Sequence, residues 1–198
     1  MNKTEPVETV WSKTRAIIHA QVIDVALDMF LEDGFENTTI EQITTAAGIS
    51  KRSFFRYFGT KEDIVLGDIE TQGRILAEAL AARPIEENPW IALERAATSL
   101  PSSKYSDERA FAIAKLVLET PSLHARHAQK HAEWQRVLVP IIQERMGYTG
   151  SIPDIKATAI VSSAIACLDA AMNVWVRGDR KKSFHTLYAE AIDTVRGR

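Results

Sequence analysis

Apolar residues recur with the period of an α-helix along most of the chain, and this regularity most constrains what the sequence can form. The first clear stripe consists of Val22, Val25, Ala26, Met29 and Phe30. These positions follow the i, i+3, i+4, i+7, i+8 spacing of an amphipathic helix. We find no alternating strand pattern of convincing length, no internal repeat and no low-complexity tract. The sequence therefore predicts an all-α protein.

Helix boundaries are marked by capping residues, glycines and prolines. Thr39 and Gln42 have the spacing of a capping box, Ser50 can cap the next helix, and Thr60 with Asp63 repeats the pattern. A bend is expected at Pro140, where the ring removes a helical hydrogen bond. The nine predicted helices span 13–33, 39–47, 51–58, 60–82, 88–100, 107–119, 120–146, 151–177 and 183–195.

Composition excludes several classes of protein. Cys167 is the only cysteine among 198 residues, so neither an internal disulfide framework nor a cysteine-based zinc module is expected. No run approaches the roughly 18 uninterrupted apolar residues of a membrane span, and the polar N-terminus does not resemble a secretory signal. We therefore expect a cytoplasmic protein with no membrane partner. The formal charge of −2 gives no sign of a nucleic-acid partner.

The segment 48–61, GISKRSFFRYFGTK, carries the most informative chemistry. Its basic residues are Lys51, Arg52, Arg56 and Lys61, and it contains no acid. The helix 51–58 is about 12 Å long, a length suited to the major groove of DNA. Phe54, Phe55 and Phe58 are expected to form one apolar edge against the first helix. Three short helices with a glycine-containing turn before the last one have the layout of a helix-turn-helix.

The run 25–64 resembles the DNA-binding domain of TetR-family transcriptional regulators. The matching residues are Ala26, Phe30, Gly34, Phe35, Thr39, Ile40, Ile43, Ala47, Gly48, Ile49, Ser50, Phe58, Lys61, Glu62, Asp63 and Ile64. The sequence departs from the usual family pattern at His19, Thr44, Arg52 and Phe55. The resemblance implies an N-terminal arm and helix-turn-helix domain in 1–63. It also implies a helical ligand-binding and dimerisation domain in 64–198, with the helix 60–82 bridging the two.

The resemblance also implies roles for single residues. Thr39 and Lys61 would contact phosphates of double-stranded DNA. The residues facing the groove and its rims would be Ser50, Lys51, Arg52, Ser53, Arg56 and Tyr57. Arg52 is the best candidate for reading a guanine, because a guanidinium can pair with both O6 and N7. A basic helix that is merely a solvated face is the plainer alternative.

The C-terminal part is expected to hold a ligand cavity and a dimer surface. Small residues on the predicted helix 151–177 would permit close approach of a second subunit at Ser162, Ser163, Ala166 and Ala170. The alternative is that this helix is the buried centre of one subunit. A weaker resemblance, to the TetR subgroup of mycofactocin-type regulators, implies a largely apolar or acyl-type effector. Candidate cavity residues are Trp90, Phe111, Trp134, Cys167 and Trp175, although large apolar residues at helical spacing more often pack in the core.

His124, His127 and His131 could present three imidazoles on one helix face. Lys130 and Arg126 lie among them and no partner carboxylate is evident, so the pattern favours a solvated polar face, and we expect neither a metal nor a cofactor. The sequence offers no glycine-rich phosphate loop, nucleophile motif or recognisable carboxylate pair. We therefore expect no enzyme but a homodimeric, ligand-released repressor. An all-helical small-molecule-binding protein or enzyme without DNA binding is the alternative.

Charge distribution refines the first impression given by net charge. The first 63 residues hold seven basic and ten acidic side chains, and no Lys or Arg occurs from Ala16 to Ser50. Four basic residues then fall within 51–61. A DNA duplex would meet that short basic surface rather than the sum over the chain.

Overall fold

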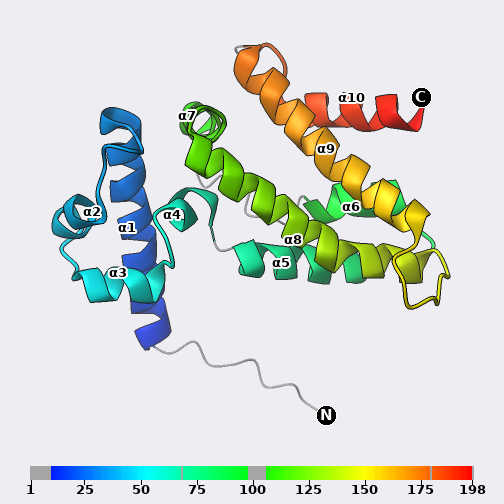
Figure 1. Ribbon diagram of the computed structural model, residues 1–198, viewed down its shortest axis with the longest axis horizontal. Coiled ribbons are helices and arrows are strands. Elements are labelled where there is room, and N and C mark those ends of the chain that lie inside the picture. Colours follow the sequence, from blue (N-terminus) through cyan, green and yellow to red (C-terminus); the bar gives the residue numbers. More distant parts are fainter. Residues whose placement is uncertain (1–9, 68, 98–105, 179, 198) are drawn as a thin grey trace. The chain divides into compact units, whose positions relative to one another are not determined.

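The computed structural model describes residues 10–67, 69–97, 106–178 and 180–197, and their contacts divide the chain into two units. The units cover 1–65 and 66–198. The boundary between them lies two residues after the expected boundary, which followed residue 63. The described ranges contain helices and no strands (Figure 1), so the predicted all-α class is confirmed. The expected helix end at Leu100 lies outside the described residues.

The N-terminal unit contains α1 (Val10–Asp33), α2 (Ile40–Ala46), α3 (Lys51–Tyr57) and most of α4 (Glu62–Leu66). α1 ends where expected, before Gly34, whose φ of +89° favours glycine. One apolar core joins these helices, and its largest members are Phe30, Phe35, Phe54 and Phe58. The rings of Phe30 and Phe35 lie 4.8 Å apart, and those of Phe54 and Phe58 lie 5.4 Å apart. His19 of α1 stacks on Phe58 with 4.6 Å between ring centres, which attaches the end of α3 to α1.

The segment 60–82 differs from the prediction because two helices replace one. α4 ends at Leu66, Gly67 has a φ of +71°, and α5 covers Ile69–Ala81. The side chain of Gln72 donates a hydrogen bond to the carbonyl oxygen of Leu66 at 3.0 Å, which satisfies a free group at the end of α4. The described residues therefore form ten helices, where the sequence pattern had merged two of them.

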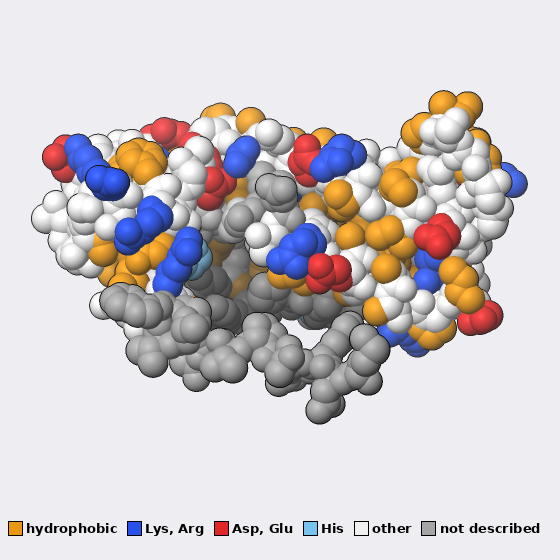
Figure 2. All heavy atoms as spheres, turned by 90° about the horizontal axis from the view of Figure 1, so that it is seen from below, with side chains coloured by type: hydrophobic (Ala, Val, Ile, Leu, Met, Phe, Trp, Pro, Cys, Tyr) orange, Lys and Arg blue, Asp and Glu red, His pale blue; other side chains and the backbone are white. Residues whose placement is uncertain are grey.

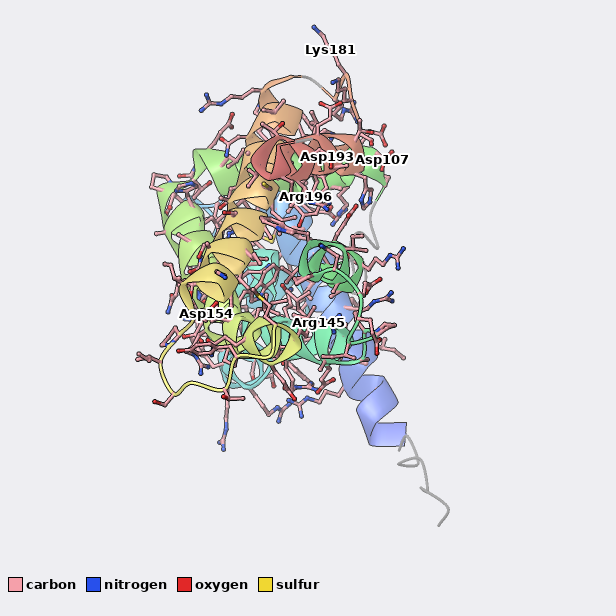
Figure 3. All side chains as sticks on the ribbon, turned by 90° about the vertical axis from the view of Figure 1, so that its right-hand side faces the viewer. Asp107, Arg145, Asp154, Lys181, Asp193 and Arg196 are labelled. Atoms are coloured by element: carbon pink, nitrogen blue, oxygen red, sulfur yellow. The ribbon has the colours of Figure 1, made fainter. Side chains whose placement is uncertain are left out.

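The C-terminal unit is built from α5, α6 (Pro89–Ala97), α7 (Asp107–Glu119), α8 (Pro121–Arg145), α9 (Ile155–Arg177) and α10 (Phe184–Arg196). α8 packs against both α5 and α9, and α10 packs along α9. Asp154 caps α9, and Arg145 near the end of α8 donates hydrogen bonds to the carbonyl oxygens of Arg83 and Glu87 (Figure 3). The contacts of Arg145 tie the end of α8 to the segment before α6.

α9 is, in the part of the chain that the structure describes, the one helix long and apolar enough to cross a membrane, with a mean hydropathy of 1.6 over 18 residues. A single such helix is weak evidence, because the core helix of a soluble protein passes the same test. Ala157, Val161, Ala164 and Ala171 of α9 are buried in the core of the C-terminal unit. One face of α9 therefore belongs to the core of the C-terminal unit.

Candidate functional site

Local hydrogen bonds define the start of α2 and the turn that leads from α2 to α3. The Thr39 N–H donates to Oε1 of Gln42 at 2.8 Å, and the Gln42 N–H donates to the Thr39 hydroxyl at 3.2 Å, so the predicted capping box is confirmed. After α2, Gly48 adopts a φ of +67°, and the Ile49 N–H donates to the carbonyl oxygen of Thr44 at 3.0 Å. This αL cap turns the chain sharply into α3.

Ser50 caps α3, as predicted, by accepting a hydrogen bond from the Ser53 N–H at 3.1 Å. Its hydroxyl also donates to the Ser53 hydroxyl at 3.1 Å. Lys51 forms an exposed ion pair with Glu41 of α2, with 3.2 Å between nitrogen and oxygen. Arg52 and Arg56 are exposed. The start of α3 therefore presents two hydroxyls and a cluster of long basic side chains.

The prediction that Phe55 joins the apolar edge of α3 is wrong. Phe54 and Phe58 are buried, but Phe55 is 55% exposed. Each helical residue advances by about 100°, so the buried pair at i and i+4 leaves the residue between them on a different face. Phe55 shares the exposed surface with Arg52 and Arg56, and Figure 2 shows Lys and Arg side chains gathered beside hydrophobic ones on the N-terminal unit.

Tyr57 lies at the margin of this surface and is half-buried. The guanidinium carbons of Arg56 and Arg15 lie 5.2 and 5.8 Å from the centre of its ring. His19 of α1 meets the same ring edge-on, with 6.4 Å between centroids. These contacts hold Tyr57 between α1 and the exposed basic face of α3.

Lys61 is bound within the N-terminal unit. Its ammonium donates hydrogen bonds to the carbonyl oxygens of Phe35 and Thr38 at 2.6 and 2.9 Å. Both carbonyls belong to the segment that leads into α2, next to the Thr39 cap. An ammonium has three donors, so these two hydrogen bonds leave one of them unused.

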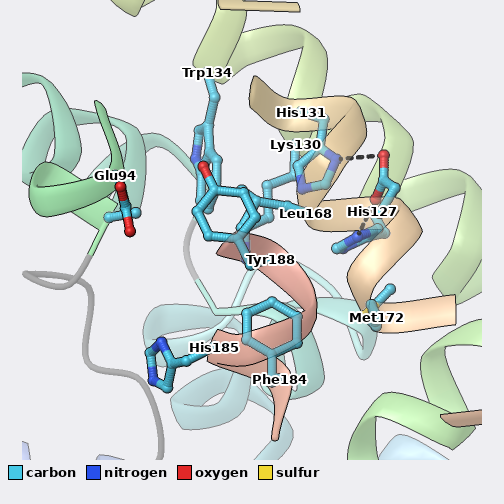
Figure 4. Close-up of a pocket in the computed structure, with 12 residues that line it drawn as sticks. Glu94, His127, Lys130, His131, Trp134, Leu168, Met172, Phe184, His185 and Tyr188 are labelled. Carbon is cyan, nitrogen blue, oxygen red and sulfur yellow. Dashed lines mark hydrogen bonds and ion pairs between the residues drawn. The ribbon is translucent and has the colours of Figure 1, made fainter. Parts of the chain in front are cut away.

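A cavity of about 280 Å³ lies within the C-terminal unit (Figure 4). Its apolar wall is formed by Ala97, Trp134, Leu168, Met172, Phe184 and Tyr188. Its polar groups come from Glu94, His127, Lys130, His131, Asp169 and His185. Apolar walls with a few convergent polar groups are typical of a small-molecule site.

Two imidazoles of α8 converge on one carboxylate of α9 in this cavity. Nε2 of His127 lies 3.3 Å from Oδ1 of Asp169, and Nδ1 of His131 lies 3.2 Å from Oδ2 (Figure 4). Burial raises the pKa of Asp169, but the hydrogen bonds with the two imidazoles outweigh this effect and hold the pKa well below its ordinary value. Burial lowers the pKa of His127, and the hydrogen bond with Asp169 opposes the shift only in part.

Lys130 projects from the same turn of α8. Its ammonium lies 4.9 Å from the centre of the Trp134 ring and 3.3 Å from the carbonyl oxygen of Leu66. Burial lowers its pKa to about 8. The indole N–H of Trp134 is buried and has no hydrogen-bond partner among the described residues. Lys130 therefore brings an amine to the cavity wall, whereas the indole nitrogen of Trp134 lies beside Gly73 of α5.

Of the five cavity residues expected from the sequence, the structure places Trp134 in this wall. Cys167 and Trp90 belong to the packed core, and burial raises the pKa of the Cys167 thiol. Phe111 and Trp175 form an edge-on pair with 5.5 Å between ring centres, and Trp175 lines a separate hollow of about 850 Å³. The structure does not bring the five residues together.

The solvated-face interpretation of the three histidines is wrong for two of them. His124 is exposed, but His131 is buried and His127 is largely buried. In the sequence, the i, i+4 spacing of His127 and His131 was the sign that these two side chains lie on one face of a helix. Their partner Asp169 lies 38 residues beyond His131, so only the packing of α9 on α8 brings it to them.

The expected dimer residues lie on the outer side of α9. Ala166 and Ala170 are exposed, and Ser162 and Ser163 are half-buried. Val174, one turn beyond Ala170, is 53% exposed. The described part of the C-terminal unit leaves this small-residue stripe uncovered.

Two family profiles match the chain. The profile described as bacterial regulatory proteins, tetR family, matches residues 22–67. The profile described as the MftR C-terminal domain matches residues 87–198, more than half of the chain. The first match contains the whole α2–turn–α3 unit, and the second contains all the residues that line the cavity.

The chain is similar to TcmR of Streptomyces glaucescens, an HTH-type transcriptional regulator, with 34% identity over 64% of this chain and 59% of TcmR. It is 26% identical to MftR of Mycobacterium tuberculosis, a protein named as a mycofactocin biosynthesis transcriptional regulator, over 96% of this chain and 95% of MftR. Its fold is similar to that of FadR from Bacillus subtilis, solved in complex with stearoyl-CoA. That likeness has a TM-score of 0.57 and 18% identity over 89% of this chain and 97% of FadR.

The helix-turn-helix geometry and these matches agree with the resemblance seen in the sequence. The chain belongs to the TetR family of bacterial transcriptional regulators, which are not enzymes, and carries an MftR-type C-terminal domain.

Proposed function

We propose that the protein is a ligand-responsive repressor that binds a palindromic operator as a homodimer and is released by a small, largely apolar or acyl-type effector. The observation that carries the proposal is the capped α2–turn–α3 unit with Arg52 and Arg56 exposed on α3. A short, rigidly capped basic helix is what the major groove of DNA accepts.

The contacts to DNA follow from the placement of the side chains. Arg52, exposed in the first turn of α3, would read a guanine through O6 and N7. Thr39 and Lys61 would hold a phosphate near the start of α2, where the helix dipole favours negative charge. The remaining contacts, to the groove and its rims, would come from Ser50, Lys51, Ser53, Arg56 and Tyr57.

Dimerisation would use the uncovered stripe of α9, with Ala166 and Ala170 at its centre and Ser162 and Ser163 beside them. Small side chains let two helix backbones approach closely, and exposed apolar residues such as Val174 gain from being covered. Two-fold symmetry would place the recognition helices about 34–36 Å apart, or a multiple of that distance, on a palindrome.

The effector would occupy the cavity of about 280 Å³ in the C-terminal unit. The apolar wall favours a largely apolar molecule, and the ammonium of Lys130 favours an acceptor group such as a carboxylate or thioester carbonyl. The fold shared with a stearoyl-CoA-bound regulator supports an acyl-type ligand. Effector binding would shift the population toward a form whose recognition helices no longer fit successive grooves, through the segment α4–Gly67–α5.

Operator fragments selected from random DNA by the purified protein, followed by gel shifts, test the proposal. Wild type should select a palindrome, and retention on random duplex DNA should fall steeply with salt. Lys61→Ala should weaken binding to all sequences and reduce the salt slope by about one unit. If Arg52→Ala and Lys61→Ala both bind the operator like wild type, the DNA-binding surface is misassigned. If the wild type selects no sequence and does not bind duplex DNA, a ligand-binding protein without DNA binding is the correct description.

A further inference from the structure

The geometry points to a divalent transition-metal site, of the zinc class, formed by His127, His131 and Asp169 in the wall of the cavity. One ligand atom from each side chain lies within 4.8 Å of the others. Two of the ligands come from one face of α8 and the third from α9, so helix packing itself assembles the set.

The ligand atoms lie near the spacing that a small ion requires. Zinc bonds of about 2.0–2.2 Å in tetrahedral geometry place neighbouring ligand atoms about 3.3–3.6 Å apart. His127 Nε2 lies 3.3 Å from Oδ1 of Asp169 and His131 Nδ1 lies 3.2 Å from Oδ2, so the carboxylate would rotate to bring one oxygen to an ion shared with both imidazoles. An ion would require the two imidazole nitrogens to approach each other by less than about 1.5 Å, which side-chain rotation can supply.

The chemical nature of the ligands selects the class of ion. Two histidines at i, i+4 on a helix, completed by a carboxylate, form a ligand set typical of zinc sites. Imidazole suits Zn²⁺, Co²⁺ and Ni²⁺, whereas Mg²⁺ and Ca²⁺ prefer oxygen ligands. All three residues line the cavity, so a fourth position would be filled by water or by an oxygen of a molecule bound there.

The surroundings of the site are compatible with a cation. Metal binding requires neutral imidazole and ionised carboxylate. The ammonium of Lys130, the nearest positive charge on α8, has its own partners in the Trp134 ring and the Leu66 carbonyl oxygen. The Asp169 carboxylate, which now accepts from both imidazoles, would exchange two hydrogen bonds for a bond to the ion.

The test uses the full chain, freed of metal with a chelator and titrated with Co²⁺, whose visible absorption reports nitrogen and oxygen ligands in low-symmetry sites. One Co²⁺ per chain should give this absorption, and Zn²⁺ should abolish it. His127→Gln, His131→Gln and Asp169→Asn should each weaken binding by about tenfold or more, because even outer partners of metal ligands are worth 10–100-fold. His124→Gln is the matched control, since His124 is exposed on the same helix, and it should bind like wild type.

A second measurement makes the result independent of how well each variant folds. Zn²⁺ should raise the thermal midpoint of the wild type, since an ion that binds only the folded chain stabilises it, and should leave that of Asp169→Asn unchanged. The proposal is overturned if the wild type gives no Co²⁺ absorption at one equivalent, or if His124→Gln loses binding as the other variants do. Neither readout involves DNA, so a failure here is separate from a failure of the repressor proposal.

Discussion

Lys61 is held against Phe35 in two ways. Its ammonium donates a hydrogen bond to the Phe35 carbonyl oxygen at 2.6 Å and lies 4.2 Å from the centre of the Phe35 ring. Phe35 is itself buried against Phe30 of α1. Lys61, which the sequence predicts to contact a DNA phosphate, therefore fastens the start of α4 to the segment between α1 and α2.

Replacing Lys61 by alanine should destabilise the N-terminal unit. The two carbonyl oxygens of Phe35 and Thr38 would lose a charged donor, which costs about 1–3 kcal/mol. Urea unfolding followed by circular dichroism measures the loss. Lys51→Ala is the control, because Lys51 only pairs with Glu41 in solvent and should change stability by less than about 0.5 kcal/mol. Equal stability of the two variants would show that Lys61 has no structural role.

Replacing Arg52 by alanine should relax the choice of base at one position in each half of the operator. A bidentate arginine–guanine contact is worth about 1–3 kcal/mol of discrimination against other bases. Competition gel shifts with operators changed one base pair at a time measure the preference. Lys51→Ala should weaken binding to all of these operators alike. A pattern of base preference in Arg52→Ala identical to that of wild type would contradict the assignment.

The parts that local sequence determines were predicted well, and those that depend on packing were not. The caps at Thr39 and Ser50 use side chains within three residues of the groups they satisfy, so spacing alone identifies them. The side of α3 that Phe55 faces depends on where α1 lies, which a pattern of three phenylalanines does not define.

Long-range contacts explain the other differences. Asp169 meets His127 across 42 residues, and no motif marks that pairing. The break at Gly67 was missed because one glycine inside an apolar pattern is tolerated in many helices. The large aromatic residues Trp90 and Phe111 were expected in a ligand wall. Of the five expected residues the cavity wall contains Trp134, and the polar residues that converge there, such as His127 and Lys130, carried no apolar signal.

Replacing Glu87 by glutamine should make stability less sensitive to acid. Glu87 accepts hydrogen bonds from Nε and an Nη of Arg83 at 2.7 and 2.8 Å and pairs with Arg95, and the hydrogen bond with Arg83 chiefly lowers the pKa of Glu87 to about 2. A carboxyl with a lowered pKa stabilises the folded chain above its unfolded pKa of about 4.5, and this contribution is lost as the pH falls toward 2.

Thermal unfolding between pH 7 and pH 2 tests this expectation for Glu87. The wild type should be more stable than Glu87→Gln at neutral pH, and the difference should shrink between about pH 4.5 and 2. Glu78→Gln is the control, since Glu78 forms an exposed pair with Arg74 in the same unit. A difference between wild type and Glu87→Gln that is constant over this pH range would contradict the role of Glu87.

Replacing Lys130 by methionine should change which ligands the cavity accepts. The ammonium is the only amine that lines the cavity in the described part of the chain, so it would provide the main attraction for a carboxylate. A long-chain fatty acid should bind the wild type at least about tenfold more tightly than the variant, since hydrogen bonds to charged groups contribute about 1.5–3 kcal/mol.

Two controls accompany this test of Lys130. The matching alcohol should bind wild type and Lys130→Met alike, and Lys156→Met, changed at an exposed lysine, should behave as wild type. Calorimetric titration gives the affinities. Equal loss of acid and alcohol would show that Lys130 acts through packing instead.

Placing a charge on the outer stripe of α9 should separate the proposed dimer. Ala166 is exposed in the C-terminal unit, so glutamate there is tolerated by the single chain but would face its own copy across a two-fold axis. Sedimentation velocity should show a dimer for wild type and a shift toward monomer for Ala166→Glu, with unchanged helicity. Ala125→Glu makes the same substitution at an exposed site on α8 and should remain dimeric. The proposed dimer would bind two half-sites at once, so Ala166→Glu should also bind a palindrome no better than a single half-site. A dimer that persists in Ala166→Glu and is lost in Ala125→Glu would assign the interface to α8 instead.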